Sequence, residues 1–203
     1  ICVMQAIQRA IDPAEITLMV DSNHAYGRSE ALYLGQALAD LHLRWYEEPV
    51  APEDYEGYAD LRRRLPMAIA GGENEHSLYG FNALFEGACV DIAQPDIGSC
   101  GGFTAARHIT ALAQAKGVEI NPHVWGSAVA QAASLHLIAA LPNTHHSLFA
   151  RQPILEYDQS SHPFRRELTR HPIQMQDGFV QINDAPGLGI EIRKDTLARY
   201  RIN

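Results

Sequence analysis

Three acidic residues recur in this chain at equal intervals, each directly after an apolar run. Asp21, Glu47 and Glu73 are spaced 26 residues apart (21 to 47, and 47 to 73). Asp96 and His123 follow two further apolar runs at similar distances. One strand-plus-helix unit of a (β/α)8 barrel takes roughly 30 residues, because about 250 residues are divided among eight units. The spacing therefore predicts such a barrel, with one of these side chains at the C-terminal end of each consecutive strand.

Carboxylates at three neighbouring strand ends have the chemistry of a divalent-cation site. A single acid at a strand end more often caps a helix or faces solvent, but three in phase favour a metal. Mg2+ takes oxygen ligands and leaves positions for water and substrate, so we predict a Mg2+ ion held by Asp21, Glu47 and Glu73. Glu48 follows Glu47, and side chains alternate along a strand. We therefore expect Glu48 to orient a neighbouring residue and not to bind the ion.

Asp96 and His123 come from the next two units and are expected to act as a pair. A carboxylate beside an imidazole fixes its tautomer, stabilises the imidazolium and raises the His pKa. His123 is therefore the predicted general base. Glu156, one unit further on, is a candidate acid that helps to neutralise a developing oxyanion. A surface glutamate in a loop fits the position of Glu156 nearly as well.

Apolar runs alternate with segments of helical periodicity, which indicates an α/β protein with a parallel sheet. Strands are expected at 16–20, 43–46, 67–70, 89–93, 118–121 and 147–149. Helices are expected at 29–41, 52–65, 77–86, 103–116 and 127–141, with Ser77 as the N-cap of the third. After residue 158 the alternation stops, and Asp177-Gly178 predicts a hairpin. We assign 1–158 to the barrel and 159–203 to a tail outside it.

Composition excludes several classes of function. A net charge of −8 argues against a nucleic-acid partner, because no basic stripe is present to neutralise phosphates. No apolar run approaches the roughly 18 residues of a membrane span. Three cysteines without framework spacing predict reduced thiols and a cytoplasmic protein. The helical pattern at residue 1, with no strand before it, predicts that a preceding part of the protein is missing.

The order and spacing of several short motifs resemble the enolase superfamily, and within it the mandelate racemase subgroup. The resemblance covers nearly the whole chain. The motifs are Val-Asp-Ser-Asn, Glu-Glu-Pro, Gly-Gly-Glu-Asn, Gln-Pro-Asp, Pro-His-Val-Trp-Gly and Ile-Leu-Glu-Tyr-Asp. The resemblance implies a (β/α)7β barrel, of which about six units are present, and a capping domain of α+β structure to which the tail at 159–203 belongs.

The resemblance also implies roles for individual residues. Asp21, Glu47 and Glu73 would bind Mg2+, the Asp96–His123 pair would be the catalytic dyad, and Glu156 would hydrogen-bond the enolate. Asn23 would lie near the substrate or metal-bound water. The implied reaction removes the proton α to a carboxylate and gives an enediolate.

Two enzymatic outcomes and one different class stay open. The last motifs resemble those of acid-sugar dehydratases and sugar-lactone cycloisomerases, which favours β-elimination from a small sugar acid or lactone. The protein is also expected to be a homo-oligomer. A racemase or epimerase of 2-hydroxy acids is the alternative enzyme. The subgroup carries a Lys-x-Lys motif before the first metal ligand, whereas this chain has only Lys116 and Lys194. The third possibility is a noncatalytic barrel remnant that acts as a binding or assembly module, against which stands the retention of all of Asp21, Glu47, Glu73, Asp96 and His123.

Overall fold

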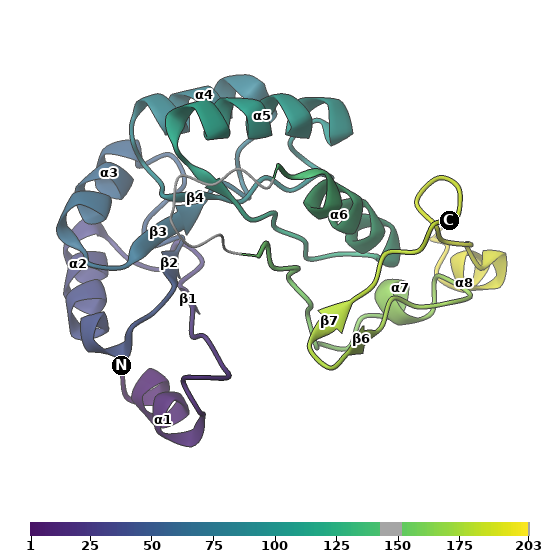
Figure 1. The fold of residues 1–203 in the computed structure, drawn as a ribbon, viewed down its shortest axis with the longest axis horizontal. Coiled ribbons are helices and arrows are strands. Elements are labelled where there is room, and N and C mark those ends of the chain that lie inside the picture. Colours follow the sequence, from purple (N-terminus) through teal and green to yellow (C-terminus); the bar gives the residue numbers. More distant parts are fainter. Residues whose placement is uncertain (143–151, 203) are drawn as a thin grey trace.

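Five short strands form one parallel sheet in which each strand pairs with the next one along the chain. The computed structural model describes residues 1–142 and 152–202 (Figure 1). The strands are β1 (Val20–Asp21), β2 (Trp45–Glu47), β3 (Ala68–Gly71), β4 (Ile92–Ala93) and β5 (Glu119–Ile120), in the order β1-β2-β3-β4-β5. This order confirms the predicted parallel sheet. The strand expected at 147–149 lies outside the described residues.

Helices follow the strands and cover the outer side of the sheet (Figure 1). They are α2 (Arg28–Ala37), α3 (Tyr55–Arg64), α4 (Ser77–Glu86), α5 (Gly102–Lys116) and α6 (Ala128–Ala140), with the 3-10 turn η1 (Ala39–Leu41) after α2. Helix α3 begins three residues later than expected because Asp54 caps it, accepting a hydrogen bond from Gly57 N at 3.0 Å. The predicted Ser77 cap is wrong: the N-cap of α4 is His76, and Ser77 N donates to Cys100 O at 3.2 Å.

The strands separate two apolar clusters, as their alternating side chains require. The larger cluster lies between the sheet and its helices and includes the fully buried Ile69, Phe81 and Ile109. The smaller cluster contains Trp45, Ala70 and Ile92 on the other face, with Ile154 packed against it. An outer core of this size holds the helices in place, so the short strands keep a fixed register.

An ion pair shows that the sheet is curled. Arg44 immediately precedes β2 and Glu119 begins β5, yet Arg44 Nη2 lies 2.6 Å from Glu119 Oε1. Two strands separate β2 from β5, and neighbouring strands are about 4.8 Å apart. Side chains of β2 and β5 would be too far apart to meet on a flat sheet. The contact therefore requires the concave inner face that a barrel wall has.

The remaining elements lie outside this wall. Helix α1 (Cys2–Ala10) has no buried residue, and its Val3 is 71% exposed.

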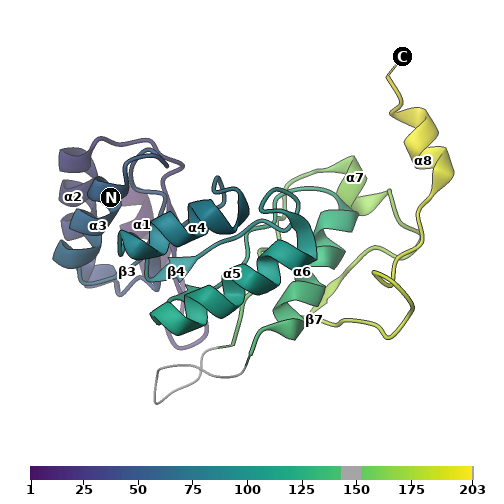
Figure 2. The ribbon, with the colours of Figure 1, turned by 90° about the horizontal axis from the view of Figure 1, so that it is seen from above.

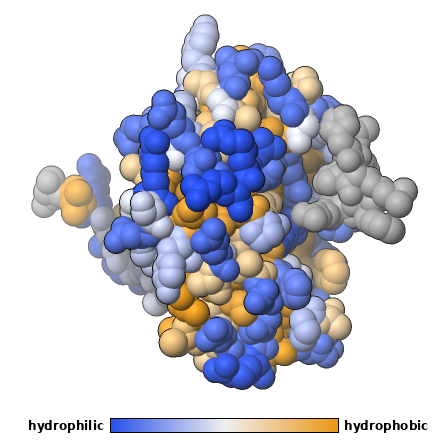
Figure 3. All heavy atoms as spheres, turned by 90° about the vertical axis from the view of Figure 1, so that its left-hand side faces the viewer, coloured by the Kyte–Doolittle hydropathy of each residue, from blue (hydrophilic) through white to orange (hydrophobic). Residues whose placement is uncertain are grey.

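Figure 3 shows the face that carries α2 and α3, where hydrophilic side chains gather over its upper half and apolar side chains are scattered below.

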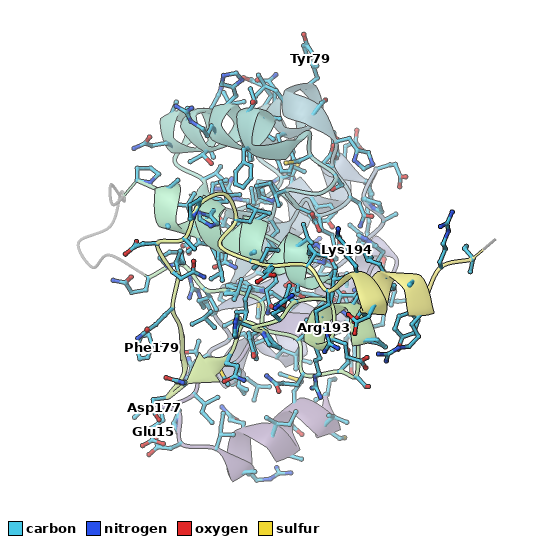
Figure 4. The ribbon with its side chains drawn as sticks, turned by 90° about the vertical axis from the view of Figure 1, so that its right-hand side faces the viewer. Glu15, Tyr79, Asp177, Phe179, Arg193 and Lys194 are labelled. Atoms are coloured by element: carbon cyan, nitrogen blue, oxygen red, sulfur yellow. The ribbon has the colours of Figure 1, made fainter. Side chains whose placement is uncertain are left out.

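The tail after residue 158 forms α7 (Pro163–Arg166), β6 (Met175–Gln176), β7 (Phe179–Val180) and α8 (Lys194–Arg199). Strands β6 and β7 pair antiparallel around Asp177 and Gly178, which have φ values of 51° and 80° and confirm the predicted hairpin. Figure 2 shows α8 at the end of the molecule opposite α2. In Figure 4, Phe179 on the hairpin and Tyr79 on α4 point outward, and they are 76% and 86% exposed.

Candidate active site

The strand register brings the first two acids together. Asp21 and Glu47 are direct partners in the β1–β2 pairing, and each is the last residue of its strand. Glu73 lies two residues beyond the end of β3, the next strand of the sheet. Since parallel strands end at one edge, the three carboxylates share the C-terminal edge of the curled sheet. Burial, and then the negative charge of Asp21, raise the pKa of Glu47 to about 7.

Hydrogen bonds within the chain set the present directions of these carboxylates. Asp21 accepts from Asn23 N at 2.8 Å and from Asn23 Nδ2 at 2.9 Å. Glu47 Oε2 accepts from Trp45 Nε1 at 2.8 Å. Within residues 1–142 and 152–202, no three His, Cys, Asp or Glu side chains are already grouped closely enough to hold a metal ion. Binding of one ion by all three acids would therefore need side-chain rotation, and it stays a prediction.

His123 lies at the centre of a ring of carboxylates. Its Nδ1 is 2.8 Å from Asp96 Oδ2, and its Nε2 is 3.4 Å from Glu73 Oε2 and 3.8 Å from Glu156 Oε2. A carboxylate accepts the Nδ1 proton, so Nε2 is the nitrogen that faces the other two acids. The structure thus brings together four residues singled out in the sequence. Glu73, Asp96 and His123 follow β3, β4 and β5, and Glu156 lies in the segment after residue 152.

Charge and burial shift the pKa values of His123 and Asp96 in opposite directions. Burial alone would lower the pKa of His123, but the hydrogen bond to Asp96 and the charges of Glu73 and Glu156 raise it to about 9. Burial would likewise raise the pKa of Asp96. The hydrogen bonds from His123 and from the Gly98 backbone outweigh that effect and hold this pKa below its ordinary value. The Asp96–His123 pair is therefore strongly biased towards carboxylate and imidazolium.

Glu156 is held by the loop that carries His123. Its Oε2 accepts from Val124 N at 2.8 Å. Burial raises the pKa of Glu156, while that backbone hydrogen bond and His123 partly offset the effect. Asn121, which is buried, accepts from Ile154 N at 3.0 Å and ties the same segment to the end of β5. The segment around Glu156 therefore belongs to the site and is not a detached surface loop.

Four residues of the site were missed by sequence reasoning. The indole of Trp45 binds Glu47, and Asn121 anchors the Glu156 segment. Two others bind Glu48: His24 Nε2 lies 2.8 Å from Oε2, and Asn74 Nδ2 donates to Oε1 at 3.0 Å. Each of these residues lies within three positions of a residue that was singled out. That proximity was the available signal, although it does not distinguish these residues from their other neighbours.

The fold and the site define a class of protein: a parallel β/α barrel wall with carboxylates and a carboxylate-paired imidazole at its C-terminal edge. A family model described as "Enolase C-terminal domain-like" matches residues 1–196. The chain therefore belongs to the enolase C-terminal domain-like family. None of the helices in the described part of the chain is long and apolar enough to cross a membrane.

Several relatives of the chain are enzymes of sugar acids by name. It is 42% identical over 200 residues to a D-galactarolactone cycloisomerase of Agrobacterium fabrum, covering 98% of this chain and 53% of that one. It superposes with a TM-score of 0.89 on the 3,6-anhydro-D-galactonate cycloisomerase of Zobellia galactanivorans, at 42% identity, covering 97% of this chain and 53% of the other.

A third relative, also a solved structure, contains a metal by its name. This is a variant of an L-talarate/galactarate dehydratase liganded with Mg and L-glucarate, and the unmodified enzyme of that name comes from Salmonella typhimurium. The TM-score is 0.82 at 30% identity, covering 96% of this chain and 45% of the other. The chain thus spans about half the length of the relatives it matches.

Proposed function

We propose that the protein catalyses Mg2+-dependent removal of the proton α to a carboxylate, followed by β-elimination from a sugar acid or opening of a sugar lactone. One observation carries the proposal: His123 is paired with Asp96 through Nδ1 and presents Nε2 to Glu73 and Glu156. An imidazole held in this way can accept a proton at Nε2 while its charge is balanced through Nδ1. The names of the relatives support the sugar-acid class.

The donor set fits Mg2+ in chemistry. Carboxylate oxygens are the ligands that this hard cation prefers, and Asp21, Glu47 and Glu73 supply them from neighbouring strands. Burial followed by the negative charge of Asp21 raises the pKa of Glu47, so a cation at this edge would relieve the repulsion between them. When bound, the ion would stabilise negative charge on the substrate carboxylate.

The residues of this chain can carry out the proton transfers. In its neutral form, His123 takes the proton from the α-carbon at Nε2, and the electron pair of the broken C–H bond passes into the carboxylate as an enediolate. Glu156, in its protonated form, hydrogen-bonds the developing oxyanion. The C–C double bond then forms as the bond from the β-carbon to its oxygen breaks. In a lactone that oxygen leaves as a carboxylate; in a hydroxy acid it takes the proton from His123 and leaves as water.

An exchange experiment tests the role of His123. A panel of acid sugars and their lactones is incubated with the protein and Mg2+ in deuterated water, and α-proton exchange and 2-keto product are followed. His123→Asn should abolish exchange and leave Mg2+ binding intact. Undiminished exchange in this variant would remove His123 from the mechanism. Exchange without 2-keto product would instead identify a racemase.

A melting experiment tests the metal. A ligand that binds only the folded state at 100 times its Kd adds about 2.7 kcal/mol of stability. The melting temperature should therefore rise when Mg2+ is added after EDTA treatment, and Asp21→Ala should remove the rise. If added Mg2+ leaves the melting temperature of the unmodified protein unchanged, the noncatalytic module is favoured.

A further inference from the structure

Three side chains form one hydrogen-bonded cluster beside the candidate metal ligands. Glu48 is 1% exposed, its Oε1 accepts from Asn74 Nδ2 at 3.0 Å, and its Oε2 lies 2.8 Å from His24 Nε2. Asn74 Nδ2 also lies 2.9 Å from His24 Nε2. His24 Nδ1 lies 2.9 Å from Val50 O, and a carbonyl can only accept, so Nδ1 carries a proton and fixes the ring. We name His24, Glu48 and Asn74 the strand-end cluster.

Each member of the strand-end cluster comes from a different strand end. Glu48 directly follows Glu47 at the end of β2, and Asn74 directly follows Glu73 after β3. His24 lies in the turn after β1, which also carries Asn23. The cluster therefore connects the three loops that follow the three candidate ligands.

The backbone of these loops needs such support. Asn23, His24 and Glu48 have φ values of 42°, 61° and 43°, a left-handed conformation that is uncommon for residues other than glycine and least usual here for Glu48, because Asn and His adopt it more readily. His24 N donates to Glu48 O at 2.9 Å, and Ser22 Oγ donates to the same oxygen at 2.9 Å.

This turn also controls the first candidate ligand. Asn23 binds both carboxylate oxygens of Asp21, through its backbone N and its Nδ2. Its position is set by its neighbour His24, which the cluster holds from the side chain and the backbone. A shift of His24 would therefore move Asn23, and through Asn23 it would move the carboxylate of Asp21.

We propose that the strand-end cluster is a positioning device that fixes the relative placement of Asp21, Glu47 and Glu73 and thereby strengthens Mg2+ binding; this rests on the proposed function. None of its three members is a candidate ligand, so each acts through another residue. Groups that orient metal ligands typically change metal affinity by 10–100-fold when they are mutated. The cluster variants should show a loss of that order.

The test measures Mg2+ binding directly by titration calorimetry, without any substrate. His24→Ala, Asn74→Ala and Glu48→Ala should each weaken Mg2+ affinity by about 10–100-fold. Glu48→Gln keeps the shape and one acceptor oxygen, so it should recover part of the loss. The double variant His24→Ala/Glu48→Ala should lose less than the two single losses combined, because the two residues act as a unit. If Glu48→Ala does not fold, His24→Ala and Asn74→Ala decide the result.

A matched control separates positioning from general destabilisation. Glu119→Gln also removes a carboxylate from a mostly buried ion pair, but at the N-terminal edge of the sheet. It should lower the melting temperature and leave Mg2+ affinity unchanged.

The outcomes distinguish the two proposals. If the cluster variants bind Mg2+ as tightly as the unmodified protein while Asp21→Ala loses Mg2+ binding, the positioning role is overturned and the proposed function stands. A parent protein that binds no Mg2+ overturns the proposed function and the positioning role together. An equal loss of affinity in Glu119→Gln would show that the cluster acts only through stability.

Discussion

The ion pair between Arg44 and Glu119 offers a direct test of the curled sheet. The pair closes at 2.6 Å across the inner face, and the two side chains are 11% and 17% exposed. Removing one partner of a buried ion pair leaves the other charge without its counterion and typically costs about 3–5 kcal/mol. Some solvent reaches both side chains here, and Arg44 Nε has no hydrogen-bond partner within residues 1–142 and 152–202. We therefore expect Glu119→Gln to cost about 3 kcal/mol, the lower end of that range.

Thermal unfolding followed by circular dichroism measures this cost. For a chain of this size, each kcal/mol lowers the melting temperature by about 2–4 °C, so Glu119→Gln should lower it by about 6–12 °C. The double variant Arg44→Met/Glu119→Gln should be less destabilised than the two single variants combined, because it removes both charges of the pair together.

An exposed ion pair of the same length provides the control. Lys116 Nζ also lies 2.6 Å from Glu86 Oε1, but the side chains are 39% and 59% exposed. Glu86→Gln should therefore cost no more than about 1 kcal/mol. If Glu119→Gln and Glu86→Gln melt at the same temperature, the Arg44–Glu119 contact does not span a dry inner face, and the reasoning from curvature fails.

Three further predictions concern the metal, acid stability and the thiols. Added Mg2+ should change the fluorescence of Trp45, whose indole donates to a candidate ligand at 2.8 Å. The change should persist in Trp125→Phe, and its survival in Trp45→Phe would contradict the assignment. Hydrogen bonds from Arg28 hold the pKa of Asp54 below its ordinary value, so this carboxylate stabilises the fold above about pH 4, and that stability is lost as the pH falls through the folded-state pKa. Between about pH 5 and pH 2, the urea midpoint of Asp54→Asn should fall less steeply with falling pH than that of the unmodified protein. Equal slopes for the two proteins would refute this. A thiol reagent should label only the exposed Cys2 in the folded protein and all three cysteines after denaturation, whereas labelling of three thiols at once would contradict their burial.

The strand order was predictable because it depends on local information. Each strand is a short apolar run that ends in a polar residue, and a parallel sheet brings such ends to one edge. That rule was sufficient to bring Asp96 beside His123 and Asp21 beside Glu47. The hairpin was equally local, because Asp177 and Gly178 tolerate the left-handed conformation that the turn requires.

Contacts that depend on side-chain direction were not predictable. The alternation rule indicated that Glu48 would not follow Glu47, but not that its carboxylate would be buried between His24 and Asn74. Those partners come from loops 24 and 26 residues away in sequence (48 − 24 and 74 − 48), and no local pattern marks them. The start of α3 was also misplaced, because the turn at 51–54 precedes the Asp54 cap.

The two edges of the sheet have a practical consequence for protein engineering. The Arg44–Glu119 pair lies where the strands begin, whereas the carboxylates and His123 lie where they end. Thermostabilising substitutions can therefore be sought at the starting edge without altering the residues that would meet a substrate. Libraries that direct the proposed activity towards other substrates would instead vary the loops at the C-terminal edge, after the stability of the scaffold has been raised.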